Sequence, residues 1–213
     1  MTDSLTVTPA ESPRLNRRQA AKIRTRGKVM EAARLLFAER GYEPATIRDI
    51  AKGAGMSTGA VFANFQDKAE LFDAILADDM ARMAKVLRQG AEDDLKVKER
   101  LSGALNAGYH ASVDELPLVQ AVVARSWFQP LAAEMRSRKA IKALVLVISD
   151  VLSDGVRSGE LRQDIDVRLI SEMIWNAYLA NYRHAAYDNL SMDDLAKRMD
   201  SQLGVILAGA LAR

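Results

Sequence analysis

The stretch from Thr46 to Phe65 reads TIRDIAKGAGMSTGAVFANF and contains two short segments with helical apolar spacing, separated by glycines at 53 and 55. Thr46 with Asp49 fits the spacing of a capping box, and Ser57 stands where a second helix needs its N-cap. The apolar stripes comprise Ile47, Ile50, Ala51 and Ala54 in the first segment, and Val61, Phe62 and Phe65 in the second. This stretch therefore predicts a helix-turn-helix, with Val61 and Phe65 in its core.

A helix-turn-helix is typical of proteins that bind duplex DNA. Its first helix crosses the phosphate backbone, and the N-terminal residues of its second helix reach base edges in the major groove. Two-helix hairpins of this size also occur as plain packing units, so that alternative stays open on the pattern alone.

A basic segment precedes the hairpin. It contains no Asp or Glu and comprises Arg14, Arg17, Arg18, Lys22, Arg24, Arg26 and Lys28. A run of this kind is either a solvated arm or a contact for nucleic acid. With the hairpin beside it, we interpret the segment as an arm for the minor groove or for phosphate.

The rest of the chain shows helical apolar spacing in nearly every segment and no alternation typical of a half-buried strand, so the predicted fold class is all-α. The first helix is expected from about Lys22 to Arg40 and ends at Gly41. Longer helices are expected from about Leu95 onward, with the last two at about 166–187 and 193–211. Residues 1–13 are expected to be a flexible tail.

Further residues frame the hairpin and make the pattern specific. An amphipathic helix ending in Gly41 and Tyr42 precedes it, and the run FQDKAELF at 65–72 follows it. From about Arg24 to Ile75 the chain resembles the TetR family of transcriptional regulators, and the remainder is similar to that family only in length and helical content.

The resemblance implies an N-terminal three-helix DNA-binding domain at 14–66 and a larger helical domain for ligand binding and dimerisation at 67–213. It also implies a homodimer that leaves a palindromic operator when a small molecule binds, with repression as the default. Neither the operator nor the ligand follows from the residues.

The resemblance also assigns DNA contacts. Carried over position by position, they are Thr46, Arg48, Ser57, Thr58, Gly59, Ala60, Phe62, Asn64 and Lys68. Lys68 lies in a first helical turn, where a cation is unfavourable toward the helix dipole, so an external phosphate explains it better than intrachain stability.

Three groove-side positions depart from the family pattern. Ala60 stands where threonine is usual, Phe62 where tyrosine is usual, and Asn64 where histidine or an aromatic residue is common. Because Phe62 has no hydroxyl, one expected hydrogen bond to the DNA backbone is missing, and packing inside the domain is its alternative role.

The expected ligand is a small apolar or aromatic molecule. The predicted pocket residues are Tyr109, Arg125, Trp127, Phe128, Trp175 and Tyr178, with Met80, Met83, Met135 and Met173 nearby and Asn176 and Asn181 as polar anchors. Plain core packing is the alternative for each of them.

Several function classes find no support in the residues. The chain has no cysteine, and its two histidines, His110 and His184, lie away from any carboxylate cluster with ligand spacing, so no metal site is expected. No phosphate loop or nucleophile elbow is recognisable, so we expect no catalytic site, no cofactor and no enzyme.

The longest apolar run is too short to span a bilayer and no signal pattern opens the chain, so we expect a cytoplasmic protein without a membrane partner. A ligand-sequestering helical protein without specific DNA binding is the alternative function, and an all-α enzyme comes third.

Overall fold

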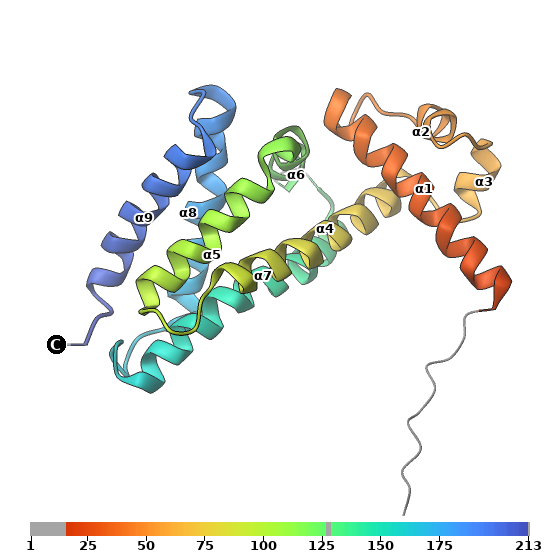
Figure 1. Cartoon of the computed structure of the whole chain (residues 1–213). Helices are drawn as coiled ribbons and strands as arrows, with labels where there is room; N and C mark the ends of the chain where they lie inside the picture. The colour runs from red at the N-terminus through yellow and green to blue at the C-terminus, as the bar shows by residue number, and fades with distance from the viewer. Residues whose placement is uncertain (1–15, 127–128, 213) are drawn as a thin grey trace, which may run out of the picture.

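The computed structural model describes residues 16–126 and 129–212, and these residues form helices joined by turns, with one isolated bridge between Leu161 and Leu211 (Figure 1). The predicted all-α class is confirmed. In chain order the helices are α1 (Arg17–Arg40), α2 (Ile47–Gly53), α3 (Thr58–Phe62), α4 (Lys68–Gly90), α5 (Val97–Ala111), the 3-10 turn η1 (Val113–Glu115), α6 (Leu116–Ser126), α7 (Leu131–Ser158), α8 (Val167–Tyr187) and α9 (Met192–Ala208). None of these helices is long and apolar enough to cross a membrane.

Helix α1 begins five residues before the expected Lys22. The reason is local, because the Asn16 side chain accepts a hydrogen bond from the backbone of the first turn and the Asn16 backbone N–H donates to the Gln19 side-chain oxygen. The basic segment is therefore helical from Arg17 onward and not an extended arm, while Arg14 lies outside the described residues. The helix ends at Gly41, whose φ of +81° is a left-handed conformation that favours glycine.

The helix-turn-helix forms as predicted from its caps. The Thr46 hydroxyl accepts from the Asp49 backbone N–H at 3.2 Å, and the Ser57 hydroxyl accepts from the Ala60 N–H at 3.2 Å. Gly55 takes a φ of +67° in the turn between the two helices. These contacts fix where α2 and α3 begin, so the polar residues at both starts serve the local fold.

The first of two buried clusters holds the helix-turn-helix together. It comprises Val29, Ala33 and Phe37 of α1, Ala45, Ile50, Ala51, Val61 and Phe65 of the hairpin region, Leu71, Phe72 and Ile75 of α4, and Leu118 of α6. Val61 and Phe65 are core residues, as predicted. The cluster draws on α4 and α6, so α1 to α3 do not bury their apolar faces by themselves.

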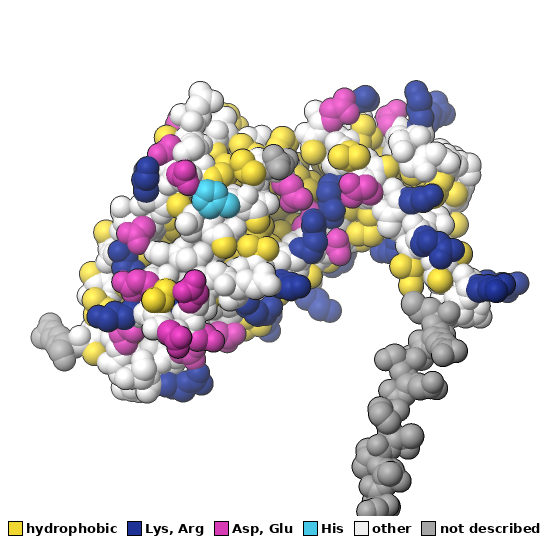
Figure 2. Space-filling model, viewed as in Figure 1, with side chains coloured by type: hydrophobic (Ala, Val, Ile, Leu, Met, Phe, Trp, Pro, Cys, Tyr) yellow, Lys and Arg dark blue, Asp and Glu magenta, His cyan; other side chains and the backbone are white. Residues whose placement is uncertain are grey.

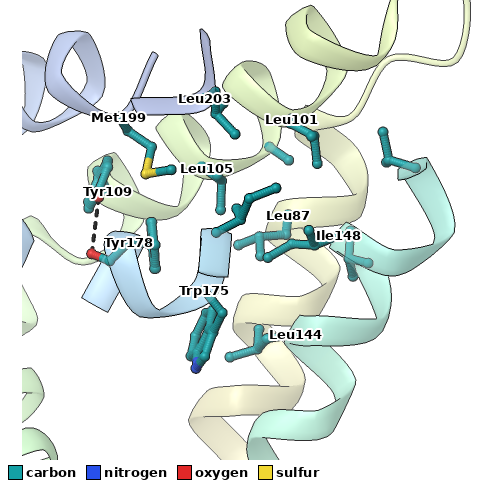
Figure 3. Close-up of a cluster of buried hydrophobic side chains, with 14 of the residues drawn as sticks. Leu87, Leu101, Leu105, Tyr109, Leu144, Ile148, Trp175, Tyr178, Met199 and Leu203 are labelled. Carbon is teal, nitrogen blue, oxygen red and sulfur yellow. Dashed lines mark hydrogen bonds between the residues drawn. The ribbon is translucent and has the colours of Figure 1, made fainter. Parts of the chain in front are cut away.

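The second and larger cluster fills the space between α5, α7, α8, α9 and the C-terminal half of α4. Figure 3 shows Trp175 of α8 extending toward Leu144 of α7, with Leu87 of α4 and Ile148 of α7 close by. Helix α4 therefore contributes its first half to one cluster and its second half to the other.

The second cluster requires a very close approach of α4 and α5. A Cβ atom placed on Gly90 would stand 2.7 Å from the carbonyl oxygen of Gly103, and one placed on Gly103 would collide with the Gly90 carbonyl. The two backbones touch here because neither residue has a side chain.

We predict that Gly103→Ala lowers the free energy of unfolding by about 1–3 kcal/mol, because the added methyl group forces α4 and α5 apart. Gly27→Ala is the matched control, since a Cβ at this α1 position meets nothing within 4 Å. It should stabilise the protein by about 0.5–1 kcal/mol through helix propensity. Urea unfolding of both variants checks the prediction, and equal stabilities would contradict the close approach.

Candidate DNA interface and ligand cavity

The face of α3 predicted to meet DNA is open to solvent. Ser57, Thr58 and Gly59 are exposed at its start, and Ala60 is half-buried. Phe62 is 55% exposed, so the alternative that it packs inside the domain is wrong. An exposed aromatic ring one helical turn beyond Thr58 extends the same outward face.

Asn64 is oriented differently from the expectation. Its amide nitrogen donates to the Ala60 carbonyl at 2.9 Å, and its Oδ1 atom is buried. The Arg26 guanidinium donates to the Asn64 carbonyl at 2.7 Å and lies 4.0 Å from the centre of the Phe65 ring. This structure therefore engages Asn64 in holding the end of α3 against α1, and a contact of its amide with DNA stays a prediction.

At the start of α2, Thr46 and Arg48 are exposed. The Thr46 hydroxyl donates to the Asp49 carboxylate at 2.6 Å, and this hydrogen bond is the main cause that lowers the pKa of Asp49. Since the Thr46 proton is used within the turn, a phosphate would have to compete with Asp49 for it. Arg48 presents its guanidinium to solvent beside this turn.

Lys68 has the intrachain role that the sequence argument rejected. Its ammonium donates to the carbonyls of Tyr42, Glu43 and Ala45 at 2.9, 3.1 and 3.1 Å, and it stands 4.3 Å from the centre of the Tyr42 ring. The interpretation that an external phosphate explains this cation better than intrachain stability is therefore wrong, because three intrachain carbonyls accept from the ammonium. The lysine ties the first turn of α4 to the loop between α1 and α2, and its contact with phosphate stays a prediction.

Basic side chains cover the unit formed by α1 to α3. Figure 2 shows Lys and Arg side chains spread over its visible face, and the basic residues Arg17, Arg18, Lys22 and Arg24 of α1 are exposed. A positive surface beside an exposed α3 suits a phosphate backbone, because the attraction does not depend on base sequence.

A cavity of about 590 Å³ lies among α4, α6, α7 and α8. Its wall is mostly apolar and includes Phe72, Ile75, Leu76, Met80 and Met83 of α4, Leu118, Val119, Val122 and Val123 of α6, Ile141 and Leu144 of α7, and Trp175, Tyr178 and Leu179 of α8. The polar lining residues are Asp79, Ser112, Glu115, Asn176, Tyr182 and Arg183. This volume and lining are typical of a site for a small, largely apolar molecule.

The predicted pocket residues divide into four groups. Trp175 and Tyr178 line the cavity, as do Met80, Met83 and Asn176. Tyr109 is fully buried behind the wall, where its hydroxyl donates to the Tyr178 carbonyl and accepts from Asn181, so both residues are core instead of pocket residues. Met135 and Met173 are exposed. Trp127, Phe128 and the side chain of Arg125 lie outside the described residues.

The sequence reasoning missed the α6 wall and the charged lining residues. Helical spacing showed that α6 has an apolar face, but that signal is the same for a core and for a cavity. Asp79, Glu115 and Arg183 gave no signal, because an isolated charged residue in a helix ordinarily faces water.

The hydroxyl groups in the wall satisfy one another. Tyr182 donates to Ser112 at 3.0 Å, Ser112 donates to the Gly108 carbonyl at 2.9 Å, and the hydroxyls of Tyr178 and Tyr182 are 2.9 Å apart. Burial raises the pKa of both tyrosines, so they stay neutral. In this part of the wall the hydroxyl protons are therefore used within the chain.

Asp79 is the exception among the polar wall residues because it is charged and only 7% exposed. Its carboxylate contacts the guanidinium groups of Arg34 on α1 and Arg82 on α4. Burial raises the pKa of Asp79, and the hydrogen bond from Arg82 and the charges of both arginines oppose that rise.

The described residues contain no cluster of His, Asp and Glu that could hold a metal ion. His184 contacts Asp188 at 2.6 Å and His110 contacts Asp193 at 3.2 Å, each as a simple pair. Two groups fall short of the ligand number that a protein metal site needs.

Comparison with known proteins matches both parts of the chain. Residues 29–75 match the model for bacterial regulatory proteins of the tetR family, and residues 76–180 match the C-terminal region of YsiA-like proteins. The HTH-type transcriptional repressor KstR2 of Mycobacterium tuberculosis is 33% identical over 156 residues, which cover 70% of this chain and 75% of that protein. The fatty acid metabolism regulator protein of Bacillus subtilis is 24% identical over 149 residues, covering 69% of this chain and 76% of the regulator.

Solved structures share the fold. The transcriptional regulator FadR from Bacillus subtilis, in complex with stearoyl-CoA, superposes with a TM-score of 0.76 at 21% identity and covers 86% of this chain and 98% of its own. The ketosteroid transcriptional regulator KstR2 of Mycobacterium tuberculosis gives a TM-score of 0.59 at 25% identity, covering 88% and 95%.

We predict that Lys68→Met lowers the free energy of unfolding by about 1.5–3 kcal/mol, because three carbonyls lose a charged donor. Lys85→Met, at an exposed position of the same helix, should change it by less than about 0.5 kcal/mol. Thermal unfolding of both variants measures the difference. Identical midpoints would show that the three hydrogen bonds do not stabilise the protein.

Proposed function

The chain belongs to the TetR family of bacterial transcriptional regulators and is a helix-turn-helix repressor, not an enzyme, and on that premise we propose that a homodimer binds a palindromic operator and leaves it when an acyl thioester of coenzyme A fills the cavity. One observation carries the proposal: Phe72, Ile75 and Leu118 line the cavity and also belong to the buried core of the helix-turn-helix. A molecule in the cavity would therefore press directly on the DNA-binding unit.

The DNA half of the proposal rests on exposure and charge. Thr58, Gly59 and Phe62 on α3 would meet the major groove, while Arg48 and the basic start of α1 would meet phosphates. Asn64 and Lys68 would join them only by exchanging their intrachain partners for DNA.

A dimer is proposed because one five-residue recognition helix reads few base pairs. Leu169 and Met173 on α8 and Val205 on α9 are exposed apolar residues, an arrangement that favours burial against a second copy. A twofold dimer would present two α3 helices to the two halves of a palindrome.

The ligand half rests on the cavity wall and on the relatives. A long apolar chain suits a wall formed mainly by Met, Leu, Ile and Val, whereas Arg183 and Asn176 offer donors to a polar group. The matched FadR structure contains stearoyl-CoA, which makes acyl thioesters the first class to test.

For DNA binding, we expect a duplex selected from random sequences to bind at least about a thousandfold more tightly than random duplex. Arg48→Ala should weaken binding to all duplexes and reduce the slope of log affinity against log salt by about one, because one phosphate contact is lost. Thr58→Ala should change which base is preferred. Selection and mobility-shift titration at several salt concentrations measure both effects, and a salt-independent complex would refute the proposed interface.

For the ligand, stearoyl-CoA should bind the protein and lower operator affinity. Met83→Trp fills the cavity from α4 and should weaken stearoyl-CoA binding at least about tenfold with operator binding retained, since Met83 lines the cavity and lies outside the helix-turn-helix core. Lys85→Trp adds the same bulk at an exposed position of α4 and should leave both affinities unchanged. Calorimetric titration and mobility shift test this, and equal ligand affinities for the two variants would place the site elsewhere.

A further inference from the structure

The wall of the cavity contacts α1 in two chemically different ways. The Phe72 ring lies 5.6 Å from the Phe37 ring of α1, centre to centre. The Asp79 carboxylate contacts the Arg34 guanidinium of the same helix. Both Phe72 and Asp79 line the cavity, whereas Arg34 and Phe37 do not.

The two contacts respond differently when α1 moves relative to α4. Apolar rings can slide against each other with little loss of stabilisation, because the hydrophobic effect depends on the buried area and not on direction. A hydrogen-bonded ion pair is directional, and a buried carboxylate that loses its partner is strongly disfavoured. The pair of Asp79 and Arg34 therefore fixes the position of α1 on α4 more sharply than the ring contact does.

The surroundings of the pair make it sensitive to the cavity. The side chain of Arg34 is only 17% exposed, and its Nε atom is buried without an acceptor. Arg82 also contacts Asp79 and lies 3.6 Å from Glu115, which lines the cavity. Both guanidinium groups contact the same oxygen of Asp79, Oδ1, and Asp79 lines the cavity, so a ligand that fills this space lies against the ion pair.

We propose that the contact between Asp79 and Arg34 holds α1 and α4 in the arrangement that binds the operator, and that a ligand lying against Asp79 favours the arrangement in which this contact is broken. The inference rests on the proposed function, because it names the route from the same cavity to the DNA-binding unit. An anionic ligand group competes with the Asp79 carboxylate for the guanidinium groups of Arg34 and Arg82, and this competition favours breaking the contact. Asp79 and Arg34 are positioning residues, which act on DNA through the placement of α1.

Linkage gives the proposal a specific signature. If breaking the contact favours the ligand-binding arrangement, a variant without it must bind operator more weakly and ligand more tightly. Simple damage to the fold would weaken both. A loss of ligand contacts alone would weaken only ligand binding.

The experiment uses Arg34→Gln, which removes the contact from outside the cavity and leaves Asp79 paired with Arg82. Asp78→Asn is the matched control, because Asp78 also contacts Arg34, at 3.4 Å, but is exposed and does not line the cavity. The full-length wild type and both variants are titrated with the selected operator, with stearoyl-CoA and with the fluorescent dye 8-anilinonaphthalene-1-sulfonate. Circular dichroism verifies that the variants are folded.

We expect Arg34→Gln to lower operator affinity without ligand about tenfold and to raise the affinity for both probes several-fold, while Asp78→Asn changes neither by more than about twofold. Asp79→Asn, which keeps the size of the side chain, should lower operator affinity in the same way. Arg34→Gln with unchanged affinities, with both lowered, or with only operator affinity lowered would overturn the proposal.

The two probes separate this inference from the proposed function. If the dye binds the wild type but stearoyl-CoA does not, the proposed ligand class is wrong and the dye still decides the role of Asp79. If neither probe binds the wild type, the cavity is not a ligand site and both proposals are overturned.

Discussion

Helix α4 is the element on which the rest of the structure depends, because one continuous helix takes part in both buried clusters. Its first half closes the core of the helix-turn-helix, and its second half packs against α5 and α7. Backbone hydrogen bonds make a helix stiff, so its two halves move together. The cavity lies against the middle of α4, and Phe72, Ile75 and Asp79 of this helix form part of its wall. Filling or emptying that cavity therefore bears on both units at once.

The same arrangement explains why polar groups in the cavity divide into two kinds. The hydroxyls of Ser112, Tyr178 and Tyr182 form hydrogen bonds with one another on the same side of the bundle. Asp79 instead reaches across to α1, so its partner belongs to the DNA-binding unit. A buried polar group needs a partner, and where that partner sits on another unit the two units become coupled.

Two residues that were predicted to contact DNA have roles within the fold. Lys68 and Asn64 were expected to present free polar groups, yet their hydrogen bonds link α4 to the loop before α2 and hold the end of α3. Donors near a helix terminus readily find carbonyl acceptors within the chain. Positions that resemble a DNA contact in sequence can thus also build the surface that meets DNA.

The all-α class, the helix-turn-helix and the starts of α2 and α3 could be predicted from the order of the residues, because apolar period and capping act between residues a few positions apart. Thr46, Ser57 and Gly41 show this directly. Three features depend on how distant helices pack: α6 forms a cavity wall, Tyr109 lies behind the wall, and Asp79 meets Arg34 across 45 positions of the chain. Periodicity tells which face of a helix is buried, but the partner of that face depends on how all the helices pack together.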